Sequence, residues 1–206
     1  MDKNELDLKI TAMEQTDKQI YKMFINSKND NKKKQFNFRD MDTKSPYDLY
    51  QTMTPLDNPF ISTSTIVELK NRIDYPYEQF DTIYLEQYKI RNILQKQEED
   101  NAQQTILAIL YPLSDKIVLI DITNIDWEQV NNNQHPYVKK GTKKAAYNTT
   151  KDKNYKILKD VIYFPLKKQP NNNITYIYNF PQLDKTYKTL YKENWDKLCH
   201  KVTTVV

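Results

Sequence analysis

Glycine is almost absent from this sequence, which contains a single glycine, Gly141, in 206 residues. Loops that wrap the phosphates of a nucleotide need several closely spaced glycines, because only glycine lets the backbone approach the ligand so closely. The serine nucleophile of the α/β-hydrolases also lies between glycines. The sequence therefore excludes both glycine-rich nucleotide-binding loops and hydrolases that use such a serine.

Cysteine and histidine are equally scarce. Cys199 is the only cysteine, so the chain forms no internal disulfide, and His135 and His200 are the only histidines. No combination of these residues has the spacing of a zinc site. The lack of disulfides fits a reducing compartment.

Long apolar runs are also missing. The longest, around Ile106–Leu110 and Ile117–Ile120, are far shorter than the roughly 20 residues of a membrane-spanning helix. Met1–Lys9 is charged and lacks the apolar segment of a signal peptide. We therefore expect no membrane partner and a location in the cytoplasm of a bacterial or phage-infected cell.

Lysine, asparagine, isoleucine and tyrosine are abundant, and their codons are AT-rich. We attribute this bias to mutational pressure in a phage or similar genome. The formal net charge is +4 and the isoelectric point is about 8.8. This mildly basic balance permits contact with phosphate groups but does not require it.

The hydrophobic pattern predicts one α/β domain over residues 1–206, with a core at about 5–166 and a mixed central sheet flanked by helices. Apolar residues spaced three and four apart predict helices at 5–25 and 81–99. We predict strands at 46–52, 62–70, 105–111, 116–123 and 160–166. The polar, lysine-rich segment 128–156 predicts a mobile basic loop, and 170–206 predicts a C-terminal strand and helix.

Two of these predicted strands carry carboxylates, Asp48 in the first and Glu68 near the end of the second. Lys70 shares a face with Glu68, since strand residues alternate between faces. A carboxylate in a covered strand is unfavourable unless it is paired or bound to a metal. Two converging carboxylates favour a divalent cation such as Mg²⁺. A lysine beside a metal-bound water can orient or deprotonate that water.

The segments Pro46-Tyr47-Asp48 and Ile66-Val67-Glu68-Leu69-Lys70 resemble the PD-(D/E)XK nuclease superfamily. The core of that family runs helix, hairpin of three strands, helix, strand, and the resemblance covers roughly residues 5–125. The family's remaining hairpin strand would be Phe36–Phe38 or part of Met53–Ile61. The resemblance implies a restriction-endonuclease-like fold and the Mg²⁺- or Mn²⁺-dependent hydrolysis of phosphodiester bonds in DNA.

The resemblance also implies roles for individual residues. Asp48 and Glu68 would bind the metal, with the carbonyl of Leu69 as a further ligand, and Lys70 would activate the water. Arg72 would meet a phosphate, since Asn71-Arg72 resembles a phage-encoded subset of the family. The auxiliary candidates on the two helices are Glu14, Asp17, Glu86, Gln87 and Lys89.

Several of these residues also have simpler interpretations. Asp17 could reach solvent past its apolar neighbours, and Glu86 and Lys89 could form a surface ion pair. Arg72 could pair with Asp74 or Glu78. A competing first carboxylate is Asp57, but it lies between two prolines, whereas the flanks of Asp48 alternate as a strand does.

The letters of the motif are weak by themselves, because Asp7-Leu8-Lys9 and Asp30-Asn31-Lys32 also match them. The β-branched strand around Glu68 and the upstream Pro-x-Asp distinguish the third match. An alternative function is a catalytically inactive protein of the same fold that binds nucleic acid or serves as a phage accessory protein. A third hypothesis is a structural protein of a virion, with tyrosines at its interfaces.

Overall fold

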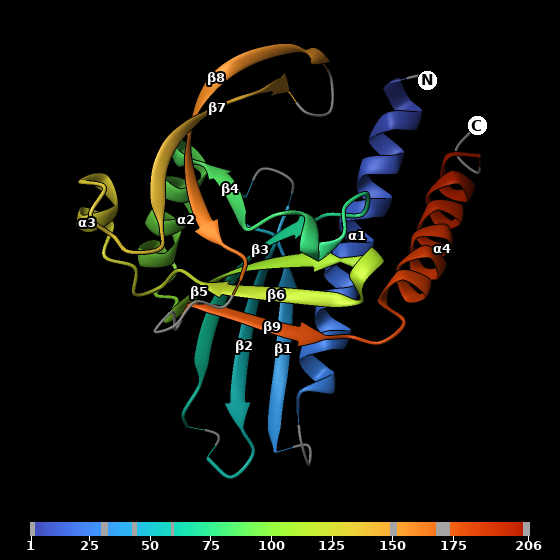
Figure 1. Ribbon diagram of the computed structural model, residues 1–206. Helices are drawn as coiled ribbons and strands as arrows, with labels where there is room; N and C mark the ends of the chain where they lie inside the picture. The colour runs from blue at the N-terminus through green and yellow to red at the C-terminus, as the bar shows by residue number, and fades with distance from the viewer. Residues whose placement is uncertain are drawn as a thin grey trace.

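The computed structural model describes residues 3–29, 33–42, 45–58, 60–148, 152–167 and 174–203 (Figure 1). The longer elements are α1 (Lys3–Ser27), β1 (Lys34–Asp40), β2 (Leu49–Pro55), β3 (Thr63–Asn71), β4 (Thr82–Glu86), α2 (Gln87–Glu99), β5 (Gln104–Tyr111), β6 (Lys116–Asp121), α3 (Trp127–Asn131), β7 (Lys139–Asn148), β8 (Asp152–Pro165), β9 (Thr175–Asn179) and α4 (Leu183–Thr203). Two short 3-10 turns lie at Tyr77–Gln79 and Pro112–Ser114.

The described strands form a six-stranded mixed sheet and a three-stranded antiparallel sheet. The order in the large sheet is β1-β2-β3-β5-β6-β9, and the order in the small sheet is β4-β8-β7. Within the large sheet β3 and β5 run parallel, and the other neighbouring strands run antiparallel. The parallel pair requires a crossover connection, and β4 and α2 supply it. The α/β class with a mixed sheet flanked by helices is therefore confirmed.

The two faces of the large sheet are covered differently (Figure 1). α1 and α4 lie side by side on one face, where Ile20 and Phe24 of α1 pack with Leu183 and Tyr187 of α4 against Leu110 and Ile117. α2 and the small sheet cover the other face. Side chains of β5 alternate between the two faces of the large sheet. Leu107 and Ile109 pack toward the small sheet, and Leu110 packs against α1 and α4.

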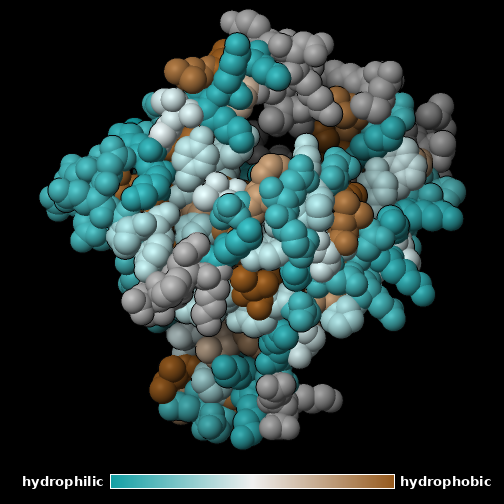
Figure 2. Space-filling model, in the orientation of Figure 1, coloured by the Kyte–Doolittle hydropathy of each residue, from teal (hydrophilic) through white to brown (hydrophobic). Residues whose placement is uncertain are grey.

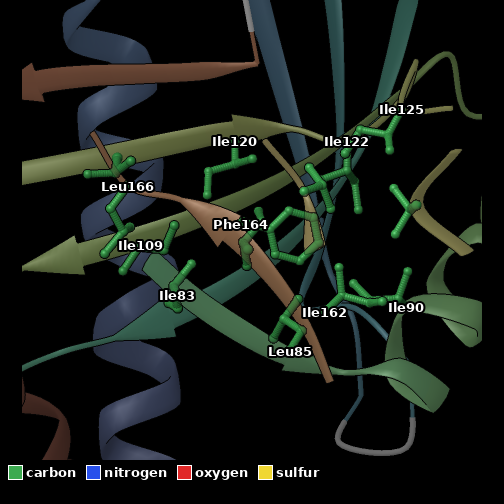
Figure 3. Close-up of a cluster of buried hydrophobic side chains, with 14 of the residues drawn as sticks. Ile83, Leu85, Ile90, Ile109, Ile120, Ile122, Ile125, Ile162, Phe164 and Leu166 are labelled. Carbon is green, nitrogen blue, oxygen red and sulfur yellow. The ribbon is translucent and has the colours of Figure 1, made fainter. Parts of the chain in front are cut away.

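The largest hydrophobic cluster lies between the two sheets and α2 (Figure 3). Phe164 and Ile162 of β8 and Ile83 and Leu85 of β4 meet the large sheet there, and Ile90 closes the cluster from α2. β4 is antiparallel to β8, with Ile83 aligned to Phe164. This packing holds the N-terminal end of α2 over the strand β3.

Several predicted boundaries were wrong. Residues 81–86, expected in a helix, contain β4, because Ile83 and Leu85 face one side and pair with β8. The first hairpin strand is Leu49–Pro55 rather than 46–52, and the additional hairpin strand is β1, which includes Phe36–Phe38. The structure also has two sheets where one was expected.

The segment 128–156 was expected to be a loop, and this prediction was wrong over its described part. It contains most of α3, all of β7 and the first part of β8, while residues 149–151 lie outside the described residues. Strand pairing is made by backbone groups, so the polar part of this hairpin gives no hydrophobic signal in the sequence, whereas the apolar residues of β8 fall within the predicted strand 160–166. The C-terminal strand and helix expected within 170–206 are present as β9 and α4, and residues 170–173 and 204–206 lie outside the described residues.

The surface seen in Figure 2 is mostly hydrophilic, with small separate apolar areas. Among the described residues, no helix combines the length and apolar character needed to cross a membrane. The single glycine lies in β7, where a Cβ atom on Gly141 would come within 3.0 Å of Cε2 of Tyr163. Its role in the structure is therefore a close contact between paired strands.

Candidate functional site

The centre of the candidate site is Glu68, which lies in β3 between β2 and β5. Every residue of 65–69 is buried. Ile66 packs with Ile93 on the α2 side of the sheet, and the alternation along the strand places Glu68 on that same side. Its side chain is only 3% exposed. A carboxylate in such a position requires compensating charge.

Two lysines provide that charge. The Nζ atom of Lys70 lies 2.8 Å from Oε1 of Glu68, and Nζ of Lys89, on the first turn of α2, lies 2.5 Å from the same oxygen. The ion pair with Lys70 bears out the shared face predicted from strand alternation. Burial acts to lower the pKa of Lys89, but the charge of Glu68, the direct contact with Glu68 and the charge of Asp48 together raise it. The buried carboxylate of Glu68 therefore has two cationic side chains within ion-pair distance.

Asp48 lies directly before β2, one position beyond the aligned pair Leu49 and Val67, and so opposite Glu68. Its N–H donates to the Val67 carbonyl at 2.9 Å, and its Oδ2 accepts from the Leu69 amide at 2.7 Å. Burial and then the charge of Glu68 raise the pKa of Asp48 to about 6. The charges of Lys89 and Lys70 act in the opposite direction. The structure thus brings Asp48, Glu68, Lys70 and Lys89 together.

This donor set fits a divalent cation held by few protein ligands. Oε1 of Glu68 is buried and lies within ion-pair distance of both Lys70 and Lys89, and no other donor among the described residues reaches it. Mg²⁺ is commonly held by one or two carboxylates and completes its shell with waters. No group of three or more histidine, cysteine or acidic side chains suitable for a metal occurs in the described ranges. Asp48 and Glu68 remain the predicted side-chain ligands, with the Leu69 carbonyl as the predicted third ligand.

A second polar group lies on the opposite face of β3. Asn71 donates from Nδ2 to Oδ1 of Asp17 on α1 at 2.7 Å. Burial raises the pKa of Asp17 to about 7, while the Asn71 hydrogen bond lowers it and the charge of Asp48 raises it further. Burial, followed by the charge of Asp17, also raises the pKa of Tyr187 on α4. Asp17 therefore points into the molecule rather than out to solvent.

The other auxiliary candidates lie elsewhere. Glu86 forms an ion pair with Lys159 of β8 instead of Lys89, because it belongs to β4. Gln87 lines a groove together with Glu86, Lys159 and Asp160. Glu14 is partly buried and adds only its charge to the surroundings of Asp17.

The structure also decides the alternative interpretations that involve Asp57 and Arg72. Asp57 is exposed in the turn after β2, so it does not compete with Asp48. Arg72 pairs with neither Asp74 nor Glu78 in the described structure, and Glu78 pairs with Lys116 instead. Arg72 lines a separate cavity together with residues from both sheets.

Sequence reasoning did not single out Asn71 as a partner of Asp17, nor Tyr187. A usable signal existed for Asn71, because it follows Lys70 and must point to the opposite, α1-facing side of the strand. Tyr187 gave no such signal, since its approach to Asp17 depends on the packing of α4 against α1. No protein-family model, curated protein or solved structure matches this chain.

Proposed function

We propose that this protein is a metal-dependent nuclease that hydrolyses phosphodiester bonds in DNA at the site formed by Asp48, Glu68 and Lys70. The observation that carries the proposal is the buried carboxylate of Glu68. It lies opposite Asp48 and contacts two lysines through one oxygen, Oε1. A metal bound there would supply charge stabilisation at phosphorus and a more acidic water.

The chain's own residues have separable tasks in this proposal. Asp48 and Glu68 would hold Mg²⁺ or Mn²⁺, and the Leu69 amide fixes the orientation of Asp48. Lys70 would orient the attacking water and assist its deprotonation. Lys89 would contribute a second positive charge where negative charge develops on the phosphate.

The order of elements supports the same proposal. A helix, α1, precedes the antiparallel strands β1, β2 and β3, and the helix α2 leads into β5, which lies parallel to β3. This is the order expected for a PD-(D/E)XK core, with the carboxylates on β3 and at the start of β2. The extra strand β4 and the small sheet are additions to that order.

The test is a cleavage assay on single- and double-stranded DNA and on RNA, with Mg²⁺, with Mn²⁺ and with a chelator. We expect metal-dependent cleavage of DNA that is lost in Glu68→Gln and reduced at least a hundredfold in Lys70→Met. Matched control substitutions are Glu5→Gln and Lys188→Met, which alter ion pairs on α1 and α4. Absence of cleavage with either metal, or full activity in Glu68→Gln, would refute the proposal.

The second candidate is a nucleic-acid-binding or phage accessory protein in which this site is inactive. It is favoured by the pairing of Glu68 with both Lys70 and Lys89, which compensates the buried charge without any metal. This candidate predicts nucleic-acid binding without cleavage. It also predicts that Mn²⁺ leaves the thermal stability unchanged, whereas the nuclease proposal predicts a stabilisation that grows with the metal concentration.

A further inference from the structure

A cavity of about 170 Å³ is lined by residues from both sheets and by the segment that follows β3, the strand of Glu68 and Lys70. Its charged lining residues are Arg72, which directly follows β3, and Lys143 of β7. The aromatic residues in its lining are Tyr75, Phe80, Tyr84 and Tyr111. The cavity thus joins the end of the strand that carries Glu68 and Lys70 to the β7–β8 hairpin.

The two cations of this cavity have no acidic partner among the described residues. Neither Arg72 nor Lys143 forms an ion pair with a carboxylate in the described part of the chain. They lie close enough to affect each other, since burial and then the charge of Arg72 lower the pKa of Lys143. Two facing cations without a counter-charge form a site that an anion would stabilise.

The aromatic side chains add flat surfaces to this positive site. Nζ of Lys143 lies 4.0 Å from the centroid of the Tyr84 ring, which fixes the lysine over that ring. Tyr75 and Phe80 lie edge to face with their ring centroids 5.6 Å apart. These two rings are 42% and 41% exposed, so part of each ring is open to a ligand.

We propose that this cavity binds one nucleotide of a single-stranded nucleic acid, with its phosphate between Arg72 and Lys143 and its base against Tyr75 and Phe80. The cavity is smaller than the roughly 300–1,000 Å³ of sites for whole small-molecule ligands, so it suits one phosphate and the edge of one ring. A single strand is required because the base faces of a duplex are already stacked on one another.

The position of the cavity links it to the nuclease proposal, on which this assignment as a substrate site rests. Arg72 follows Lys70 by two residues, which corresponds to about 7 Å along a strand. A nucleotide bound at Arg72 would therefore belong to the same nucleic-acid strand as the phosphate bound at Glu68 and Lys70. The cavity would select substrates with an unpaired nucleotide next to the point of cleavage.

Binding is tested without metal, so that cleavage does not interfere. Fluorescence anisotropy in the presence of a chelator measures the affinity for a labelled oligo-dT. The same measurement is made on an abasic strand and on a duplex of equal length. We expect oligo-dT to bind more tightly than both. Arg72→Gln and Lys143→Gln should weaken binding of oligo-dT and of the abasic strand, and each should reduce the salt dependence of log K by about 0.7.

The aromatic substitutions separate base contact from phosphate contact. Tyr75→Ala and Phe80→Ala should each weaken oligo-dT binding by about fivefold or more and leave binding of the abasic strand unchanged. The matched controls are Lys140→Gln, on the opposite face of β7, and Tyr176→Ala, a 46% exposed tyrosine on β9. Circular dichroism spectra identify variants that fail to fold, and Arg72→Lys then replaces Arg72→Gln, with a smaller expected loss.

The proposal is overturned if the Arg72 and Lys143 variants bind like the parent protein, or if Tyr75→Ala weakens both strands equally. Duplex binding that matches oligo-dT binding would also overturn it. Binding and cleavage are measured separately, so failure of this binding proposal can be distinguished from failure of the nuclease proposal. A protein that binds oligo-dT as described but cleaves nothing retains this site and loses the enzymatic function.

Discussion

The side chain of Asp48 accepts a 2.7 Å hydrogen bond from the backbone amide of Leu69, the residue between Glu68 and Lys70. This contact ties the first carboxylate to the segment that carries the other two candidate residues, across a hairpin of more than a dozen residues. It also uses one oxygen of Asp48 and leaves the other for a ligand. Because of this contact, we expect two substitutions of Asp48 to differ in their effect on stability.

Asp48→Asn keeps an acceptor for the Leu69 amide, whereas Asp48→Ala removes it. We expect Asp48→Ala to be less stable than Asp48→Asn by about 1–3 kcal/mol, because a part-buried N–H is left without a partner. Urea denaturation at pH 8 measures the difference, with the exposed Asp196→Asn as a control. Equal stability of the two Asp48 variants would show that the hydrogen bond contributes nothing. Both should lose cleavage activity.

Asp17 should make the protein less stable as the pH rises. Folding raises the pKa of Asp17 to about 7 from about 3.9 in the unfolded chain, so the folded state binds the proton more tightly. The resulting stabilisation is complete below about pH 4 and is lost as the pH approaches 7. Its upper limit is about 4 kcal/mol, from about 1.4 kcal/mol for each pKa unit.

Asp17→Asn removes this titration and keeps an oxygen to accept from Asn71. We therefore expect the variant to be more stable than the parent at pH 8 and similar to it at pH 4.5. Urea denaturation at both values measures this, again with Asp196→Asn as the control. The prediction is contradicted if the difference in the free energy of unfolding between the parent protein and Asp17→Asn is the same at both pH values.

Glu68→Gln should destabilise the protein by leaving two ammonium groups without their shared partner. We expect a loss of about 2 kcal/mol, below the roughly 3–5 kcal/mol of a fully buried pair, because Lys70 and Lys89 are 28% and 30% exposed. Lys89→Met in the Glu68→Gln background should cost less than in the parent. A double-mutant cycle by urea denaturation measures the coupling, and strictly additive effects would be incompatible with the ion pair.

Lys89→Met should bind Mn²⁺ more tightly than the parent protein while cleaving DNA more slowly. Its ammonium group occupies Oε1 of Glu68 and so competes with a metal for that oxygen. Isothermal titration calorimetry measures the affinity, and Lys96→Met, on the same helix but paired with Glu99, serves as the control. Weaker Mn²⁺ binding in Lys89→Met would show that Lys89 supports the metal site instead of competing with it.

Asn194 should be important for the packing of α4 against α1. Its Nδ2 donates to Oγ1 of Thr16 and to Oε1 of Gln19, both at 3.0 Å, and the residue is buried. Asn194→Ala should lower the free energy of unfolding by about 2 kcal/mol, because buried acceptors lose their donor. Chemical denaturation compares it with Glu193→Ala, an exposed neighbour on the same helix. A loss no larger than that of Glu193→Ala would contradict this role.

The sequence by itself determined the local features of the site. The β-branched run before Glu68 predicted a buried strand, and alternation predicted that Lys70 shares its face, which the 2.8 Å ion pair bears out. The strands predicted at 46–52 and 62–70 correspond to β2 and β3, with ends that differ by three residues and by one residue, and Phe36–Phe38 was one of two alternatives for the remaining hairpin strand. These features depend on periodicity within one segment, and so they are visible in the order of residues.

Only the tertiary structure decided which distant groups meet. Glu86 and Lys89 are three residues apart, but the pairing of β4 with β8 directs Glu86 to Lys159 while α2 directs Lys89 to Glu68. The cavity of Arg72 and Lys143 joins residues 71 positions apart in the chain. Strand pairing between polar segments leaves no hydrophobic signal, and so the pairing of β7 with β8 and the partners it brings could not be predicted from the sequence.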